Sequence, residues 1–142
     1  MPDDQETIDY RLDAQVGFLL RKANQRHLAI FAAGIDNLTP LQFASLAKLL
    51  EEGPLSQNAL GRATAMDAAT IKGVIGRLRD RGLVTTLPDA GDRRRLTVAL
   101  TASGRSLVSA LTQTASKISA DTLGPLTPDE QQLFLRLLQR LT

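Results

Sequence analysis

Apolar residues recur along the chain first at helical and then at strand-like intervals, and this pattern predicts the order of the elements. Between residues 9 and 34 they fall three and four positions apart, which is the spacing of one face of an α-helix. This stripe comprises Leu12, Val16, Leu19, Leu20, Ala23, His27, Ile30 and Phe31. Because an apolar face must be covered, the predicted helix needs a packing partner.

Five further helices are predicted, four of them from capping residues, since Ser, Thr and Asp at a helix start accept hydrogen bonds from the first free backbone N–H groups. Four of these helices start at the caps Thr39, Ser56, Asp67 and Thr127, and the fifth opens at residues 101–104. They end near Gly53, Ala63, Arg81, Thr122 and Leu141. Thr39 and Thr127 are each followed by proline, which favours the first helical position. The two helices on either side of residues 64–66 are joined by a tight turn and predict a helix-turn-helix.

Beyond Gly82 the periodicity changes from helical to alternating. Residues 83–87 and 96–100 are rich in β-branched side chains, and residues 88–95 between them are turn-forming and charged. We interpret this segment as a two-stranded hairpin with a long basic tip, called the wing below. The predicted fold is mainly α with a small two-stranded β-hairpin, in the form of a winged helix-turn-helix.

Composition limits the possible classes of protein. A chain of 142 residues with 43% hydrophobic residues is long enough for one domain, here residues 1–142, without disulfides or a structural metal. It contains no cysteine, and residues 1–6 are acidic where a signal peptide would be basic. We expect a cytoplasmic protein with no membrane segment and no cofactor.

Charge is divided unevenly along the chain. Residues 56–105 carry nine Lys and Arg against four Asp and Glu, whereas residues 1–55 carry five against eight. A basic module between less basic arms is the distribution expected if only the module meets nucleic acid. On charge alone, an ordinary solvated surface is an equal alternative.

The helix that follows Asp67 has the pattern of a recognition helix. Its apolar residues Ile71, Val74, Ile75 and Leu78 follow helical spacing and are predicted to face inward. The opposite face is small or cationic and is formed by Ala68, Ala69, Thr70, Lys72, Gly73 and Arg77. So slim a face fits a major groove, with Thr70 and Lys72 near base edges and Arg77 near phosphate. The alternative is a solvated amphipathic helix, which Gly73 and Gly76 disfavour because glycine destabilises helix interiors.

The predicted wing tip carries Asp92, Arg93, Arg94 and Arg95. Three consecutive cations on a protruding hairpin suit a narrow minor groove, where the potential is strongly negative. We interpret Asp92 as a carboxylate that orients a neighbouring arginine. An arginine-rich loop taken alone is usually solvated surface, and its position after a helix-turn-helix is what favours DNA contact.

The order and spacing of several segments resemble the MarR (multiple antibiotic resistance regulator) family over nearly the whole chain. The segments are residues 38–43, 55–60, 78–84, 92–95 and 100–104. We include Ser56 and Gln57, from the second segment, among the predicted DNA contacts. The resemblance implies that Arg94 is the minor-groove arginine and Asp92 its supporting carboxylate. The chain departs from the family pattern in two ways. Glycine occupies positions 73 and 76, where longer polar residues are common in the family, and the absence of Cys excludes the peroxide-sensing branch.

The resemblance also implies a homodimer on a pseudo-palindromic double-stranded DNA operator. Residues 38–104 would form the DNA-binding lobe, and residues 9–34 and 105–142 the dimerisation helices. The apolar faces at both ends of the chain independently favour a second copy as their partner.

Family members typically bind a small aromatic anion between the dimerisation helices and the DNA-binding lobe. The candidates for this effector site are Arg21, Arg26 and His27, and residues 18–27 resemble members that respond to aromatic acids or their CoA thioesters. His27 lies on the apolar stripe, where its ring could hydrogen-bond a carboxylate or a phenolic oxygen. The alternative is a buried histidine satisfied by a backbone carbonyl.

Two rival functions remain for comparison. An enzyme lacks support because the chain has one histidine, no cysteine, no glycine-rich phosphate loop and no set of residues with metal-ligand spacing. A winged-helix module that binds proteins and not DNA is the stronger rival, because the same scaffold serves both purposes. The function predicted here is a DNA-binding transcriptional regulator, a repressor that an aromatic effector releases.

Overall fold

The computed structural model describes residues 9–142, and helices dominate it. The helices are α1 (Val16–Gly34), α2 (Pro40–Glu52), α3 (Gln57–Ala63), α4 (Ala68–Asp80), α5 (Ala102–Leu123) and α6 (Pro128–Gln139). The mainly helical class and the winged helix-turn-helix are confirmed. The acidic residues 1–6, on which the expectation of no signal peptide rested, lie outside the described residues.

The predicted helix caps are confirmed by their hydrogen bonds. The side chains of all four predicted caps accept from the backbone N–H three positions later. Thr101, which was not predicted as a cap, does the same at the start of α5. The prediction that the first helix starts at Asp9 is wrong: a 3-10 turn at Leu12–Ala14 precedes it, and α1 begins at Val16. Gln15 is extended and makes no side-chain cap. The apolar spacing therefore begins several residues before the α-helix itself does.

The hairpin forms as predicted, from β2 (Val84–Pro88) and β3 (Leu96–Leu100). A third strand, β1 (Leu55–Ser56), was not predicted, and it pairs antiparallel with β3 to give the order β1-β3-β2. Two residues are too few to show an alternating pattern. The pairing sets Ser56 opposite Thr97 and so joins the start of α3 to β3 near the wing tip.

The core lies between α2, α3, α4, the sheet and α5, and Phe31 of α1 extends it. Its most buried side chains include Leu46, Leu49, Leu60, Ile71, Leu78, Val98 and Val108. Gly104 seats α5 against the sheet, since a Cβ added there would overlap the carbonyl oxygen of Leu83. Only glycine permits so close an approach of the two backbones.

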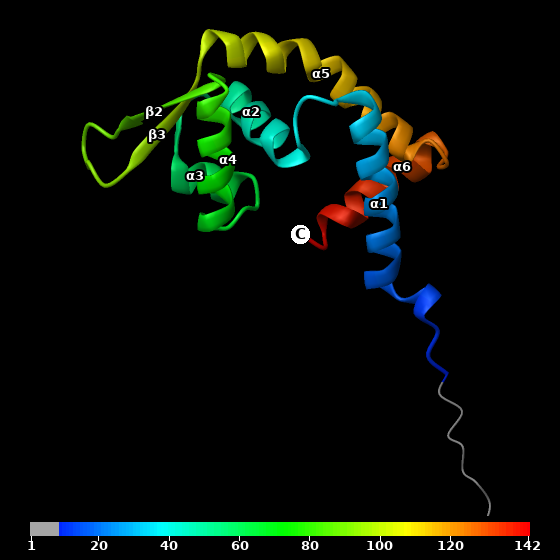
Figure 1. Cartoon of the computed structure of the whole chain (residues 1–142). Coiled ribbons are helices and arrows are strands. Elements are labelled where there is room, and N and C mark those ends of the chain that lie inside the picture. The colour runs from blue at the N-terminus through cyan, green and yellow to red at the C-terminus, as the bar shows by residue number, and fades with distance from the viewer. Residues whose placement is uncertain (1–8) are drawn as a thin grey trace, which may run out of the picture.

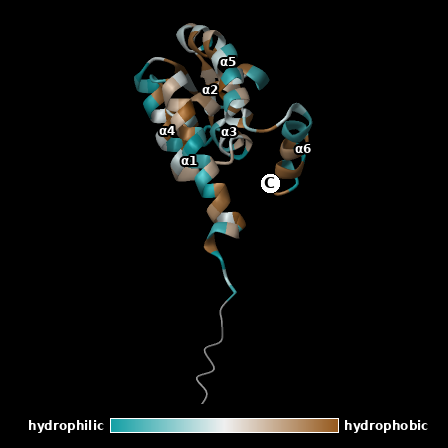
Figure 2. Cartoon of the chain, turned by 90° about the vertical axis from the view of Figure 1, so that its right-hand side faces the viewer, coloured by the Kyte–Doolittle hydropathy of each residue, from teal (hydrophilic) through white to brown (hydrophobic). Residues whose placement is uncertain are grey.

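The molecule has the form of an arch. Helix α5 runs along the top, from the lobe that contains α2 to α4 and the wing to the other side, where α1 and α6 descend (Figure 1). No residue of α6 is buried, and α1 buries only Phe31. Figure 2 shows hydrophobic residues on α6 and on the lower part of α1. Within residues 9–142, no helix is both long and apolar enough to cross a membrane.

Candidate nucleic-acid interface and effector site

Helix α4 turns its apolar face inward, as predicted. Ile71, Val74, Ile75 and Leu78 are all buried. On the opposite face Ala68, Ala69, Lys72, Gly73 and Arg77 are exposed, and Thr70 is half-buried. The exposed face is therefore narrow along the first two turns of the helix and carries its cations at Lys72 and Arg77.

Neither glycine of α4 is explained by packing within the chain. A Cβ added at Gly76 would meet nothing within 4 Å, and one added at Gly73 would meet only Nη1 of Arg77, at 4.0 Å. Because glycine in a helix interior is destabilising relative to alanine, the open space over these positions favours close approach of another molecule.

Arg79 and Arg81, which follow Arg77, form hydrogen bonds within the chain. Arg81 donates to the carbonyl oxygen of Asn37 at 2.8 Å, and Arg79 donates to the hydroxyl of Thr86 at 3.3 Å. These contacts tie the end of α4 to the loop before α2 and to β2. Of the three arginines in and just after the second half of α4, Arg77 is the one that lies over the predicted DNA face.

Asp67 fixes the start of α4. Its carboxylate accepts from the backbone N–H of Thr70 at 2.7 Å. Hydrogen bonds from the backbone and then the side chain of Thr70 lower the pKa of Asp67, because they stabilise the charged form. The cap therefore carries a full negative charge at neutral pH, at the end of the helix where the macrodipole favours it.

The wing tip is exposed from Gly91 to Arg95. The carboxylate of Asp92 accepts from the backbone N–H of Arg94 at 2.9 Å, and the carbonyl of Asp92 accepts from the N–H of Arg95 at 3.0 Å. We expected the carboxylate to orient an arginine side chain, whereas it shapes the backbone that presents Arg94. The arginine side chain is left exposed.

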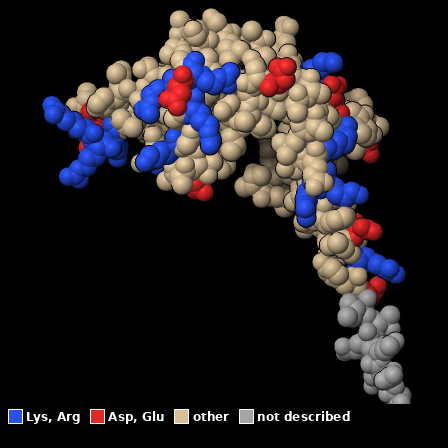
Figure 3. Space-filling model, in the orientation of Figure 1, with Lys and Arg blue, Asp and Glu red and all other residues tan. Residues whose placement is uncertain are grey.

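Residues from α3 and the wing lie beside one another. A small hollow of about 80 Å³ is lined by Ser56, Gln57, Asn58, Arg94, Arg95 and Leu96. The β1–β3 pairing explains this, since it fixes Ser56 beside Thr97. Figure 3 shows lysine and arginine side chains gathered on the wing tip and over the lobe next to it. The predicted DNA contacts from α3, α4 and the wing thus belong to one lobe.

A hollow of about 220 Å³ lies between α1, α2 and α5, where the lobe meets the helical arm, the part of the molecule formed by α1, α6 and the end of α5. It is lined by His27, Phe31, Pro40, Phe43, Ala115, Ile118 and Ser119. The rings of Phe31 and Phe43 meet edge to face, with centroids 6.1 Å apart. Its wall is mainly apolar, with His27 and Ser119 as the polar groups, which suits a small aromatic ligand.

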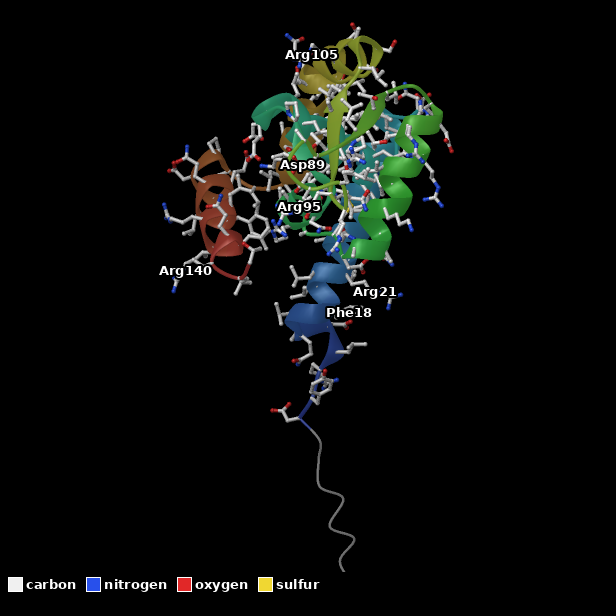
Figure 4. All side chains as sticks on the ribbon, turned by 90° about the vertical axis from the view of Figure 1, so that its left-hand side faces the viewer. Phe18, Arg21, Asp89, Arg95, Arg105 and Arg140 are labelled. Carbon is white, nitrogen blue, oxygen red and sulfur yellow. The ribbon has the colours of Figure 1, made fainter. Side chains whose placement is uncertain are left out.

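The three candidate effector residues diverge in the structure. His27 is half-buried, and its Nδ1 lies 2.8 Å from the hydroxyl oxygen of Thr122. Arg26 donates to the carbonyl oxygens of Asp121 and Thr122 and so binds the end of α5. Arg21 is exposed and points away from α6 (Figure 4). The structure brings Arg26 and His27 together at Thr122, and it does not bring Arg21 there.

Helices α1 and α6 enclose a long apolar trough. It comprises a hollow of about 620 Å³ and an adjoining one of about 400 Å³, which share Leu20, Ala23, Phe134 and Leu138. The second hollow also contains His27, Asn24, Ser119 and Thr122. Thr122 and Ser119 gave no signal in the sequence, because one small hydroxyl on a helix has no distinctive pattern.

The capped helix pair, the slim recognition helix and the arginine-tipped wing define a winged helix-turn-helix protein. The sequence model of the MarR family matches residues 36–95. The HTH-type transcriptional repressor NicR of Pseudomonas putida is 46% identical over 138 residues, which cover 96% of this chain and 87% of NicR. The chain therefore belongs to the MarR family and is a DNA-binding transcriptional regulator.

Solved structures agree with this assignment. A probable transcriptional regulator from Pseudomonas aeruginosa superposes with a TM-score of 0.89 at 53% identity, covering 93% of this chain and 100% of that one. BpsR of Bordetella bronchiseptica, whose DNA binding is regulated by 6-hydroxynicotinic acid, superposes with a TM-score of 0.89 at 42% identity, covering 93% and 96%. The chain thus shares the family fold over nearly its whole length.

Proposed function

We propose that this chain is a homodimeric repressor that binds a pseudo-palindromic operator in the cytoplasm and is released by a small aromatic acid. The proposal that the chain binds DNA rests on one observation: the slim face of α4 and the arginines of the wing lie on the same lobe. Lys72 and Thr70 are assigned to base edges, Arg77 to phosphate, and Arg94 to the minor groove. Ser56 and Gln57 are assigned to the sugar-phosphate backbone of the DNA beside the wing.

A dimer is proposed because α1 and α6 leave their apolar faces open. In the described part of the chain, α6 buries no residue, yet leucines and Phe134 line its trough. A second copy related by a two-fold axis covers both faces at once. It also presents two α4 helices, as a palindromic operator requires.

The effector proposal rests on the hollow between α1, α2 and α5. Its aromatic wall and the nearby His27 suit a single aromatic ring that carries polar substituents, and its volume of about 220 Å³ favours a free acid over a CoA thioester. The regulation of BpsR by 6-hydroxynicotinic acid supports the same ligand class. Binding there would favour one relative position of lobe and arm, and so shift the spacing of the two α4 helices.

The test is a selection of duplexes from a random pool, followed by anisotropy titrations of the selected duplex with and without 6-hydroxynicotinic acid. We expect the acid to weaken DNA binding by about tenfold or more, which corresponds to about 1.4 kcal/mol of coupling. Binding to no duplex at low salt would instead favour the protein-binding winged-helix module. Tight DNA binding that no aromatic acid changes would contradict only the effector.

A further inference from the structure

His27 belongs to a hydrogen-bond network that favours one position of its ring hydrogen over the other. Its Nδ1 lies 2.8 Å from Oγ1 of Thr122, and the same hydroxyl donates to the carbonyl oxygen of Ile118 at 2.8 Å. A hydroxyl has one hydrogen, so a Thr122 that donates to Ile118 can only accept from the imidazole. With the ring hydrogen on Nδ1 both bonds form, whereas with the hydrogen on Nε2 the hydroxyl keeps only one of them.

Arg26, the residue before His27 on α1, binds the same part of α5. Arg26 donates to the carbonyl oxygens of Asp121, at 2.9 Å, and Thr122. These carbonyls belong to the last turn of α5, where helices leave acceptors without the usual partner four residues on; the carbonyl of Asp121 also accepts from the N–H of Gly124 at 3.2 Å. Two consecutive residues of α1 therefore bind the same turn of α5, which sets the position of the Thr122 hydroxyl relative to the ring.

One polar atom of His27 is then left for a ligand. The side chain lines both the hollow between α1, α2 and α5 and the one beside α6. Since Nδ1 is engaged by Thr122, the remaining ring nitrogen is Nε2. In a neutral imidazole with its hydrogen on Nδ1, Nε2 is an acceptor.

We propose that Thr122 is a specificity-determining residue: it holds neutral His27 in the Nδ1–H form, so that Nε2 accepts a hydrogen bond from a hydroxyl or ring N–H of the effector. The ligand class is an aromatic acid with such a donor on its ring. A carboxylate is disfavoured at Nε2, because two acceptors would face each other. This inference rests on the proposed effector site, and Thr122 acts through His27.

The ring hydrogen can be located directly, because His27 is the only histidine in the sequence. Long-range ¹H–¹⁵N NMR correlations on the full-length protein at about pH 8, without ligand, should show a protonated Nδ1 and an unprotonated Nε2. Thr122→Ser keeps the hydroxyl and should retain this pattern, whereas Thr122→Val should shift the ring towards the Nε2–H form. A wild-type ring protonated on Nε2 would overturn the inference.

The ligand class is tested by calorimetric titration with three matched acids: 6-hydroxynicotinic, 6-methoxynicotinic and nicotinic acid. The wild type should bind the first about tenfold more tightly than the other two, since only it offers a donor. Thr122→Ser should keep this preference and Thr122→Val should reduce it to about twofold, with circular dichroism confirming that both variants fold.

The outcomes separate this inference from the proposed function. Equal affinity for the three acids would refute the donor requirement while leaving an aromatic-acid effector in place. A protein that binds none of them would refute both. A preference that Thr122→Val does not change would refute the role of Thr122 alone.

Discussion

Arg94 is presented by a turn that Asp92 holds through the backbone, so its guanidinium extends freely from the wing. If it meets DNA, Arg94→Ala should flatten the dependence of log affinity on log salt by about 0.9 for each phosphate that is no longer neutralised, or about 1.8 for a dimer with two wings. Anisotropy titrations at several salt concentrations measure this slope.

The matched control for Arg94→Ala is Lys117→Ala. Lys117 is exposed on α5, and its ion pair with Asp121 at 3.8 Å is worth little. Removing this charge should leave the salt slope unchanged. Equal salt slopes for wild type and Arg94→Ala would show that Arg94 does not contact DNA.

Gly104 and Gly76 allow a paired test of stability. Gly104→Ala places a methyl group on the carbonyl of Leu83 and should destabilise the protein by about 1–3 kcal/mol. Gly76→Ala meets open space within the chain and should stabilise it by about 0.5–1 kcal/mol. Urea unfolding at one fixed protein concentration measures both, and loss of stability in Gly76→Ala would show that position 76 is packed.

The role of a single residue could be predicted from the sequence where it depends only on residues close by in the chain. The cap at Asp67 and the inward residues of α4, such as Ile71, were predictable because helical geometry alone determines their places. The roles of Arg26 and Thr122 were not predictable, since they depend on α1 meeting the end of α5, more than 90 residues away.

At the scale of elements, α4 depends on its cap. Asp67 accepts from Thr70, and this hydrogen bond holds its pKa below the ordinary value of 3.8. A lowered folded-state pKa stabilises the fold above the unfolded-state value, and this contribution is lost as pH falls through the folded-state pKa. We therefore expect the stability difference between wild type and Asp67→Asn to change below about pH 4.

Asparagine suits this comparison because it caps helices well and does not titrate there. Urea unfolding of both proteins from pH 6 to pH 3 gives the difference, in which the other carboxylates largely cancel. Asp67→Ala should be less stable than both at neutral pH. A constant difference between wild type and Asp67→Asn across this range would show that the charge of Asp67 does not contribute.

Elements were predicted as far as each carried its own signal. The four predicted caps, the apolar spacing after residues 101–104 and the alternating hairpin each indicated an element, and the predicted bounds agree closely with the structure. Strand β1 was missed because two residues owe their conformation to β3, a distant partner. The start of α1 was placed too early because no capping residue marks it.

At the scale of the whole molecule, the trough between α1 and α6 is the surface offered to a second copy. Leu137 lines it and is 46% exposed in the single chain. Leu137→Glu would bury a charge at the interface, so it should shift the protein to monomers and weaken operator binding at least about a hundredfold through loss of bivalency. Light scattering and anisotropy measure the two effects.

Leu41→Glu is the control, because Leu41 is similarly exposed, at 44%, and lies at the start of α2 away from the trough. It should leave the oligomeric state unchanged. A wild-type protein that is monomeric at micromolar concentration, or a Leu137→Glu protein that remains dimeric, would contradict the proposed interface.

The sequence indicated that the end helices need a partner, because their apolar stripes have nothing nearby to cover them. It could not place the hollow beside Phe31 and Phe43, since that space is defined by three helices from distant parts of the chain. The structure places the candidate DNA residues on one lobe, and their contacts with DNA stay a prediction. It does not bring the three effector candidates together, because adjacency on α1 did not determine which helix each residue meets.

Helix α5 also has a mechanical consequence. It is one uninterrupted rod of 22 residues, seated on the sheet at Gly104 and bound by Arg26 and His27 at its far end. A helix of that length measures about 33 Å, so a tilt of only about 5° at one end displaces the other by about 3 Å. A small movement near the His27 ring could therefore tilt α5 and shift the two DNA-binding lobes of the proposed dimer out of register with successive turns of the duplex.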